Sequence, residues 1–327
     1  MSSICRLAFG AIAAATLALT CVAAGAQTWP SKPITIIVSF PPGGDSDALA
    51  RVFAEKLTTR IGQRVVVENR TGASGTIGNS FVAKSPADGH TLLFTPNTMT
   101  TAPLVLKPGT GATYDVINDL EPVILMGRSS MFVVVNAASG IQNIRELVAA
   151  AKAGKVPDYA SPGSGSPMHI LGALFNRNTG ADIKQVPYRG SGPAIIDLVA
   201  GHVQLMYTTL GPVAQHIAVG KLRNLGVASP QRSPLAPDVP TLAESGVLDS
   251  EVIGWQGFFA PRATPAPIVR SLNEHFNEML KMPDVLARMQ TLALAPAGGD
   301  PAVLRRLVAV DYERYAKLIK ELGIQAD

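Results

Sequence analysis

The sequence predicts a two-lobed α/β protein, and three observations support this fold class. Short runs of β-branched residues alternate with longer amphipathic stretches, the order expected for parallel strands joined by right-handed helical crossovers. The 327 residues, 47% of them hydrophobic, are enough to bury a large core. They are also many for a single sheet, so two lobes are the better interpretation.

The first 26 residues are predicted to be a secretory signal peptide. One positive charge, Arg6, precedes an uncharged apolar run, and a small-x-small cleavage pattern at 24–26 stands before the polar Gln27. A retained membrane anchor is the alternative, but the alanine-rich run and the cleavage pattern favour a cleaved signal. Both cysteines, Cys5 and Cys21, lie inside this segment, so the mature chain would use no disulfide in an oxidising compartment.

The elements of the first half follow from the apolar pattern. The run 34–38 (ITIIV) is a buried strand, and the apolar residues of 47–62 recur at the spacing of a helix. Further strands are expected at 63–70, 91–96 and 121–127, with a Gly-rich turn and a short helix between the first two.

The alternation continues to about residue 210 and then changes. Strands are expected at 131–136, 157–162, 184–188 and 203–208, and helices at 141–154, from Pro167 and from Pro193. The run 254–261 is expected to be a strand that crosses between lobes, with Trp255 in the core or lining a cleft. After it the chain is predicted to be nearly all helix, with Asp300 as a cap, Pro301 in the first turn and Gly323 at the end.

Three turns that follow predicted strands carry the candidate site. Ligands of open parallel sheets bind beyond the carboxyl ends of the strands, where helix N-termini present free N–H groups. In the first turn, 41–47, Gly43 and Gly44 let a ligand approach the main chain, and Ser46 or Asp47 is expected to cap the next helix.

The other two turns have a similar composition. The second, 159–169, offers hydroxyl groups and glycines that suit an oxyanion such as a carboxylate or phosphate. The third places Tyr188, Gly190 and Ser191 at a strand end, with Asp197 further into the helix. Any one such turn is more often structural than functional. Three in the same topological place favour a binding cleft.

Several chemistries find no support in the sequence. The glycines of 71–78 are too widely spaced for a dinucleotide fingerprint, and neither a phosphate loop nor a nucleophile elbow occurs. The histidines show no metal-ligand spacing, so no metal or cofactor is expected. Lys and Arg are scattered and the net charge is only +4, which indicates no nucleic-acid surface. One enzymatic alternative stays open, a secreted serine hydrolase that uses Ser164 or Ser166 with His169.

Long ordered blocks resemble the extracytoplasmic solute receptors of tripartite tricarboxylate transporters, the Bug family. They include SFPPGGDSDALAR (39–51), SPGSGSPMH (161–169), VPYRGSGP (186–193) and GWQGFFAP (254–261). The resemblance covers nearly all of 27–327. It implies a two-lobed, type II-like periplasmic binding protein, each lobe a mainly parallel sheet flanked by helices, with two chain crossovers at the hinge. The first lobe would be 27–127 plus 254–327, and the second 128–253.

The same resemblance implies a function without catalysis. The protein would capture a small organic carboxylate between its lobes in the periplasm and deliver it to the membrane permease subunits of the transporter. It is expected to act as a monomer. A receptor that feeds a sensor kinase is a further alternative, and the identity of the carboxylate stays open.

The ligand-binding residues are also implied by the resemblance. Backbone amides and ordered waters at the first two turns would hold the carboxylate, and the third turn and the loop 95–98 would shape the rest. These residues are Phe40, Pro41, Pro42, Gly43, Gly44, Asp47, Thr95, Asn97, Ser161, Gly163, Ser164, Gly165, Ser166, His169, Tyr188, Gly190, Ser191 and Asp197. No Lys or Arg lies in the first two turns, so amides and helix dipoles would meet the anion.

Two positions depart from the pattern of the family. His90 stands where an aromatic residue is expected, which concerns packing. Thr208 and Thr209 replace a run that is more often acidic, so they are expected to alter the pocket around the end of the ligand that carries no carboxylate.

Overall fold

The computed structural model describes residues 29–107, 109, 113–247 and 251–325. The predicted signal peptide, 1–26, lies outside the described residues. A compact unit begins at Lys32 and contains all the elements described below. None of its described helices is long and apolar enough to cross a membrane.

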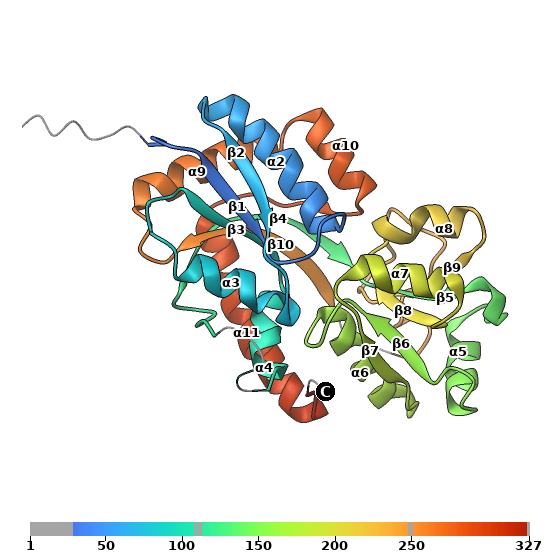
Figure 1. Cartoon of the computed structure of the whole chain (residues 1–327). Helices are drawn as coiled ribbons and strands as arrows, with labels where there is room; N and C mark the ends of the chain where they lie inside the picture. Colours follow the sequence, from blue (N-terminus) through green and yellow to red (C-terminus); the bar gives the residue numbers. More distant parts are fainter. Residues whose placement is uncertain (1–28, 108, 110–112, 248–250, 326–327) are drawn as a thin grey trace, which may run out of the picture. The chain divides into compact units, whose positions relative to one another are not determined.

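A six-stranded sheet forms the centre of the first lobe (Figure 1). The strand order is β11-β4-β10-β3-β1-β2, with β1 (Ile34–Val38), β2 (Val65–Asn69), β3 (Thr91–Pro96), β4 (Leu120–Ser130), β10 (Ile253–Pro261) and β11 (Ala295–Pro296). One face is covered by α2 (Asp45–Ile61), α9 (Ala266–Met279) and α10 (Pro283–Thr291). The other face is covered by α3 (Thr76–Ala83), which follows the 3-10 turn η1 (Ala73–Gly75), and by α4 (Thr98–Val105) and α11 (Pro301–Leu322).

A five-stranded sheet forms the second lobe. Its order is β7-β6-β8-β5-β9, with β5 (Phe132–Asn136), β6 (Asp158–Ser161), β7 (Lys184–Pro187), β8 (Leu205–Thr208) and β9 (Leu222–Val227). Helices α5 (Ile144–Lys152) and α6 (Pro167–Thr179) share a core with one face. Helix α7 (Ser191–Ala200) and the short η3 (Gly211–Val213) and α8 (Ala214–Ala218) pack on the other, and η2 (Ala137–Ser139) follows β5.

Both sheets are mixed, which corrects the expectation of mainly parallel sheets. β1 pairs in parallel with β2 and β3, and β6 with β7 and β8. β10 pairs antiparallel with β3 and β4, and β5 with β8 and β9. The chain enters β5 and β10 directly from the other lobe, without a helical crossover on the same sheet. The rule that makes βαβ units parallel therefore does not set the direction of these strands.

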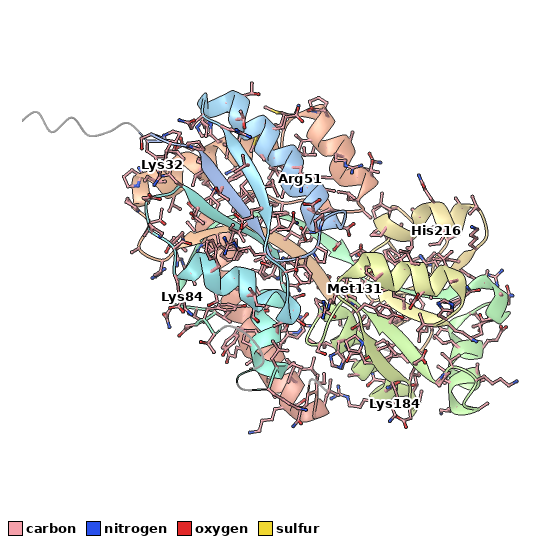
Figure 2. All side chains as sticks on the ribbon, viewed as in Figure 1. Lys32, Arg51, Lys84, Met131, Lys184 and His216 are labelled. Carbon is pink, nitrogen blue, oxygen red and sulfur yellow. The ribbon has the colours of Figure 1, made fainter. Side chains whose placement is uncertain are left out.

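The chain passes between the lobes twice. β4 ends at Ser130 and β5 begins at Phe132, so Met131, labelled in Figure 2, lies at the junction. The chain returns after β9 and enters β10, whose Ile253 pairs with Ser130. The two-lobed α/β fold with two crossovers is thereby confirmed.

Helix α11 packs against the cores of both lobes. Its Leu304 and Val308 join the core of the first sheet, whereas Tyr315 and Ile319 belong to the core of the second lobe. A helix of 22 residues is roughly 33 Å long, enough to reach from one core to the other. The predicted ends of α11 are confirmed, because Asp300 Oδ1 accepts a hydrogen bond from the Ala302 N–H at 2.7 Å and Gly323 is left-handed.

Loss of the Asp300 cap should destabilise the whole protein, since α11 joins both lobes. We expect Asp300→Ala to lower the free energy of unfolding by about 1 kcal/mol in a denaturant titration. Asp300→Asn keeps a side-chain oxygen that can accept the same hydrogen bond, so it should lower the free energy of unfolding by only a few tenths of a kcal/mol. Equal losses in the two variants would show that the capping bond is unimportant.

Candidate functional site

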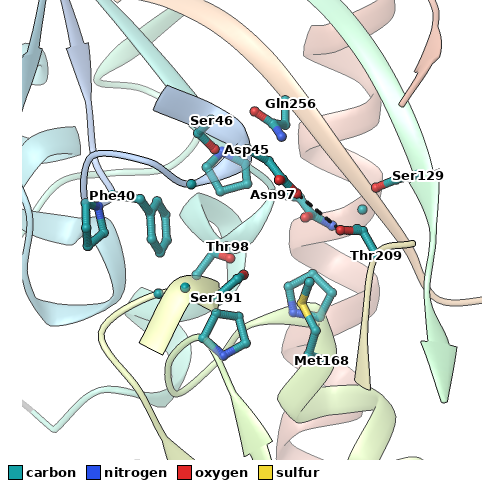
Figure 3. A pocket seen from close by; sticks show the side chains of 18 of the residues that line it. Phe40, Asp45, Ser46, Asn97, Thr98, Ser129, Met168, Ser191, Thr209 and Gln256 are labelled. Atoms are coloured by element: carbon teal, nitrogen blue, oxygen red, sulfur yellow. Dashed lines mark hydrogen bonds between the residues drawn. The ribbon is translucent and has the colours of Figure 1, made fainter. Parts of the chain in front are cut away.

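A cavity lies between the two lobes. It encloses about 900 Å³, including space open to solvent. The first lobe contributes Phe40–Ser46, Pro96–Thr98 and Gly254–Gln256; the second contributes Pro162, Pro167, Met168, Arg189–Pro193 and Thr209; Ser129 and Met131 line it at the junction. The N-terminal ends of α2 and α7 thus face one cavity from opposite lobes (Figure 3).

The turn between β1 and α2 is fixed by a side chain that does not itself line the cavity. Asp47 Oδ2 accepts a hydrogen bond from the Gly43 N–H at 3.0 Å, and Gly43 is left-handed with φ +84°. Arg51 and Asn69 donate to the same carboxylate at 2.9 and 3.0 Å. Burial raises the pKa of Asp47, but these hydrogen bonds outweigh it and hold the pKa below its usual value. Asp47 is a positioning residue for the turn.

The expected cap of α2 is wrong in one respect. Neither Ser46 nor Asp47 is the N-cap, because the helix begins at Asp45 and its N-cap is Gly44, without a side-chain hydrogen bond. Asp47 reaches back beyond the cap to Gly43 instead. The N–H groups of the first helical turn are therefore left without a capping side chain.

The second turn is tightly packed and lies behind the cavity wall. Ser166 Oγ caps α6 by accepting from the His169 N–H at 3.2 Å, and Ser161 Oγ accepts from Gln185 Nε2 at 2.6 Å. Thr101 of α4 donates to the Gly165 carbonyl, which ties this turn to the first lobe. Only its prolines and Met168 reach the cavity lining.

This geometry gives no support to the serine-hydrolase alternative. The ring Nδ1 of His169 accepts a hydrogen bond from the Gly165 N–H at 3.1 Å, so its lone pair already has a donor. Ser166 Oγ is engaged as the helix cap. Because Nδ1 accepts, the proton of the neutral ring lies on Nε2, so neither nitrogen is free to receive a serine proton.

The third turn lies close to the first turn of the opposite lobe. Gly190 is the N-cap of α7 with φ +101°, and a Cβ built on it would stand 3.3 Å from Pro41 Cδ. Helix α7 begins at Ser191, two residues before the predicted start at Pro193. Tyr188 Oη donates to Asp197 Oδ2 at 2.7 Å, outside the cavity lining. This hydrogen bond, with that to His202, lowers the pKa of Asp197.

The structure brings about half of the expected residues together. Eight line the cavity: Phe40, Pro41, Pro42, Gly43, Gly44, Asn97, Gly190 and Ser191. The other ten support the walls or lie behind them: Asp47, Thr95, Ser161, Gly163, Ser164, Gly165, Ser166, His169, Tyr188 and Asp197. Thr209 lines the cavity and Thr208 does not. No cluster of His, Asp or Glu suited to a metal ion occurs among the described residues.

Sequence reasoning missed Asp45. It is the first residue of α2, lines the cavity, and accepts a hydrogen bond from Thr209 Oγ1 of the other lobe at 3.2 Å (Figure 3). Burial raises its pKa to about 6, although the Thr209 bond and Arg288 act in the opposite direction. Its position directly after Gly43–Gly44, at a helix start, could have marked it as a site residue. Asp47 is at nearly the same position, so this signal does not tell the two acids apart.

The chain matches the model of the TctC family, the tripartite tricarboxylate transporter family receptor, over residues 49–324. The chain belongs to this receptor family. It is 39% identical over 301 residues to Protein BugT of Bordetella pertussis, covering 91% of each chain.

Solved structures of similar proteins agree with this assignment. Rpa4515 of R. palustris with adipate is 33% identical, with a TM-score of 0.85 over 91% of this chain and 99% of that one. MatC of Rhodopseudomonas palustris with bound malate is 29% identical, with a TM-score of 0.82 over 89% of this chain and 100% of that one. Members of this TctC receptor family are receptors rather than enzymes, and the chain shares their two-lobed fold.

The pKa values of Asp45 and Asp47 in this TctC receptor are shifted in opposite directions, so the two side chains should affect folding stability with opposite sign. The folded pKa of Asp45 lies above its unfolded value, so burying its charged form destabilises the folded protein. This destabilisation is fully present above about pH 6 and disappears below about pH 4, where the carboxyl is protonated in both states. Asp45→Asn should therefore stabilise the ligand-free protein at pH 7.5, by about 1–3 kcal/mol.

The matched variant is Asp47→Asn. The folded pKa of Asp47 lies below its unfolded value, so its stabilisation is present at neutral pH and is lost as the pH falls through the folded pKa. This variant should be less stable than the native protein at pH 7.5. Urea titrations at pH 7.5 and 4 measure both differences, and changes of the same sign would contradict the assigned environments.

Proposed function

We propose that this protein is a periplasmic solute-binding receptor that captures a small organic carboxylate between its lobes. The observation that carries the proposal is the cavity into which α2 and α7 direct their N-terminal ends from opposite lobes. Free N–H groups and the positive end of the helix dipole suit a small anion. The similar proteins solved with adipate and malate, both carboxylates, support the ligand class.

The proposal includes the architecture and the partners expected from the sequence. The lobes are taken as 27–127 plus 254–327 and 128–253, and closure about the two crossings would enclose the ligand. Export by the segment 1–26 would place the mature monomer in the periplasm. There it would deliver the carboxylate to the permease subunits of a tripartite tricarboxylate-type transporter. In the family to which the chain belongs, the receptor is part of such a transporter.

The binding residues divide into two groups under this proposal. The turn 40–44, Asn97, Gly190 and Ser191 contact the ligand, because they line the cavity. Asp47, Asp197 and the second turn, including Ser161 and His169, hold those contacts in place. Backbone N–H groups at a helix N-terminus would meet the carboxylate, since they are free donors at the positive end of the helix dipole.

A thermal-shift screen of the mature protein against small carboxylates tests the function. A ligand at a hundred times its dissociation constant should add about 2.7 kcal/mol of stability. The ligand should be recovered unchanged. Stabilisation by sugars or cations with no response to any carboxylate would refute the proposal, as would turnover that is lost on Ser166→Ala.

Gly190 provides a variant that tests where the ligand binds. Gly190→Ala should weaken binding of the carboxylate found in the screen about tenfold or more, since a Cβ there meets Pro41 as the lobes approach. Gly201→Ala, at the other end of α7, also has a positive φ but more room. Its αL backbone should make the alanine cost about 1–2 kcal/mol of stability, less than at Gly190 (φ +101°, ψ 174°), and should leave affinity unchanged in isothermal titration calorimetry. Equal affinities in the two variants would place the ligand elsewhere.

A further inference from the structure

The charges of the cavity are unevenly distributed. Among the lining residues, Asp45 is the one acid and Arg189 the one base. Asp45 belongs to the first turn of α2, and Arg189 precedes the N-cap of α7 on the opposite lobe. Arg189 also lines a neighbouring hollow with Ser39 and Tyr188, whereas Asp45 does not. The negative charge therefore lies at the α2 side of the cavity and the positive charge at the α7 side.

The two helix ends differ in what they attract. Helix α7 has no acid in its first turn, so its free N–H groups, with Arg189 beside them, favour an anion. Helix α2 carries Asp45 and Asp47 in its first turn. Arg51 pairs with Asp47, but no salt bridge joins Asp45 to a Lys or Arg in the described part of the chain. The α2 side thus offers the cavity a carboxylate without a salt bridge among the described residues, and the charge of Arg288 offsets its burial only in part.

Asp45 has hydrogen-bonding capacity to spare. One hydrogen bond, from Thr209 Oγ1, reaches its Oδ2. Gln256 of β10 lines the same cavity as Asp45 (Figure 3). Gln256 Oε1 is buried and has no hydrogen-bond partner within the described residues. Two acceptors with unused lone pairs therefore belong to residues that line one cavity, and a ligand with several N–H donors could satisfy both.

We propose that Asp45 selects a carboxylate that also carries a protonated amine, so that the ligand is a zwitterion rather than a dicarboxylate. The amine would bind Asp45 beside Thr209 and Gln256, and the carboxylate would bind at the α7 end near Arg189. This inference rests on the proposed function, since it names the ligand class of the same cavity.

Charge balance is the physical reason. A dicarboxylate placed here would bring its second anion against the Asp45 carboxylate, in a partly buried site where repulsion is screened little. An ammonium group at the same place gains a charge-assisted hydrogen bond and removes an unpaired charge. With a pKa of about 6, the Asp45 carboxyl is ionised at pH 7.5.

Matched pairs of ligands test the inference. Two pairs have equal numbers of methylene groups and differ only in the group at one end: glutarate with 4-aminobutanoate, and adipate with 5-aminopentanoate. A third pair, benzene-1,4-dicarboxylate with 4-(aminomethyl)benzoate, has one methylene more in the amino acid, which keeps its amine basic. Dissociation constants are measured by calorimetry at pH 7.5 and constant ionic strength for the native protein, Asp45→Asn and Asp284→Asn. Asp284 is a first-turn acid of α10 that does not line the cavity, so its variant controls for the loss of one negative charge.

We expect at least one amino acid to bind the native protein tenfold or more tightly than its diacid partner. Asp45→Asn should reduce that preference at least tenfold, and Asp284→Asn should leave it unchanged. Diacids that bind as well as their partners, or a preference that survives Asp45→Asn, would overturn the inference while leaving the receptor function intact. An equal change for both ligand classes would make Asp45 only a contact between lobes, and no binding by any carboxylate would overturn the proposed function itself.

Discussion

The antiparallel pairing of β4 and β10 is the constraint on which the rest of the structure depends. The pairing runs from Ile253 with Ser130 to Pro261 with Leu120, with register shifts at Gln256/Gly257 and Phe258/Phe259, so one long ladder holds the two strands that connect the lobes. Pairing of this length fixes where the second lobe begins relative to the first sheet. The cavity lies beside this ladder, because Ser129, Gly254 and Gln256 belong to it.

From this constraint the site follows in two steps. The strands β1 and β3 of the first sheet end near the ladder, so the first turn and Asn97 reach the cavity. Asn97 is tied to β10, because its Nδ2 donates to the Ile253 carbonyl at 2.9 Å and its N–H to the Trp255 carbonyl at 3.0 Å. The second lobe then brings α7 opposite α2. Helix α11, which packs against both cores, is the third connection between the lobes.

The sequence was enough to predict most of the elements, though not the strands β9 and β11, and the edge of the sheets where the site lies. It was not enough to predict which side chains face the site. Strand and turn signals are local, so β1 and the glycines of the first turn could be recognised. Asp45 and Asp47 carry the same signal at a helix start. They are distinguished by Asn69 and Thr209, which come from elsewhere in the chain. The serines of the second turn suggested a lining, yet tertiary contacts with α4 and β7 direct Ser161 and Gly165 away from the cavity.

The direction of β5 and β10 could not be predicted from local sequence either, since it is set by the passage of the chain between lobes rather than by any helical crossover.

The central claim is that the interlobe cavity holds a carboxylate on helix N-termini. A crystal structure of the mature protein with the tightest carboxylate from the screen tests it most directly. The account predicts carboxylate oxygens at about 3 Å from N–H groups in the first turn of α7 or α2. A ligand bound outside the cavity, or held there without these N–H groups, would contradict it.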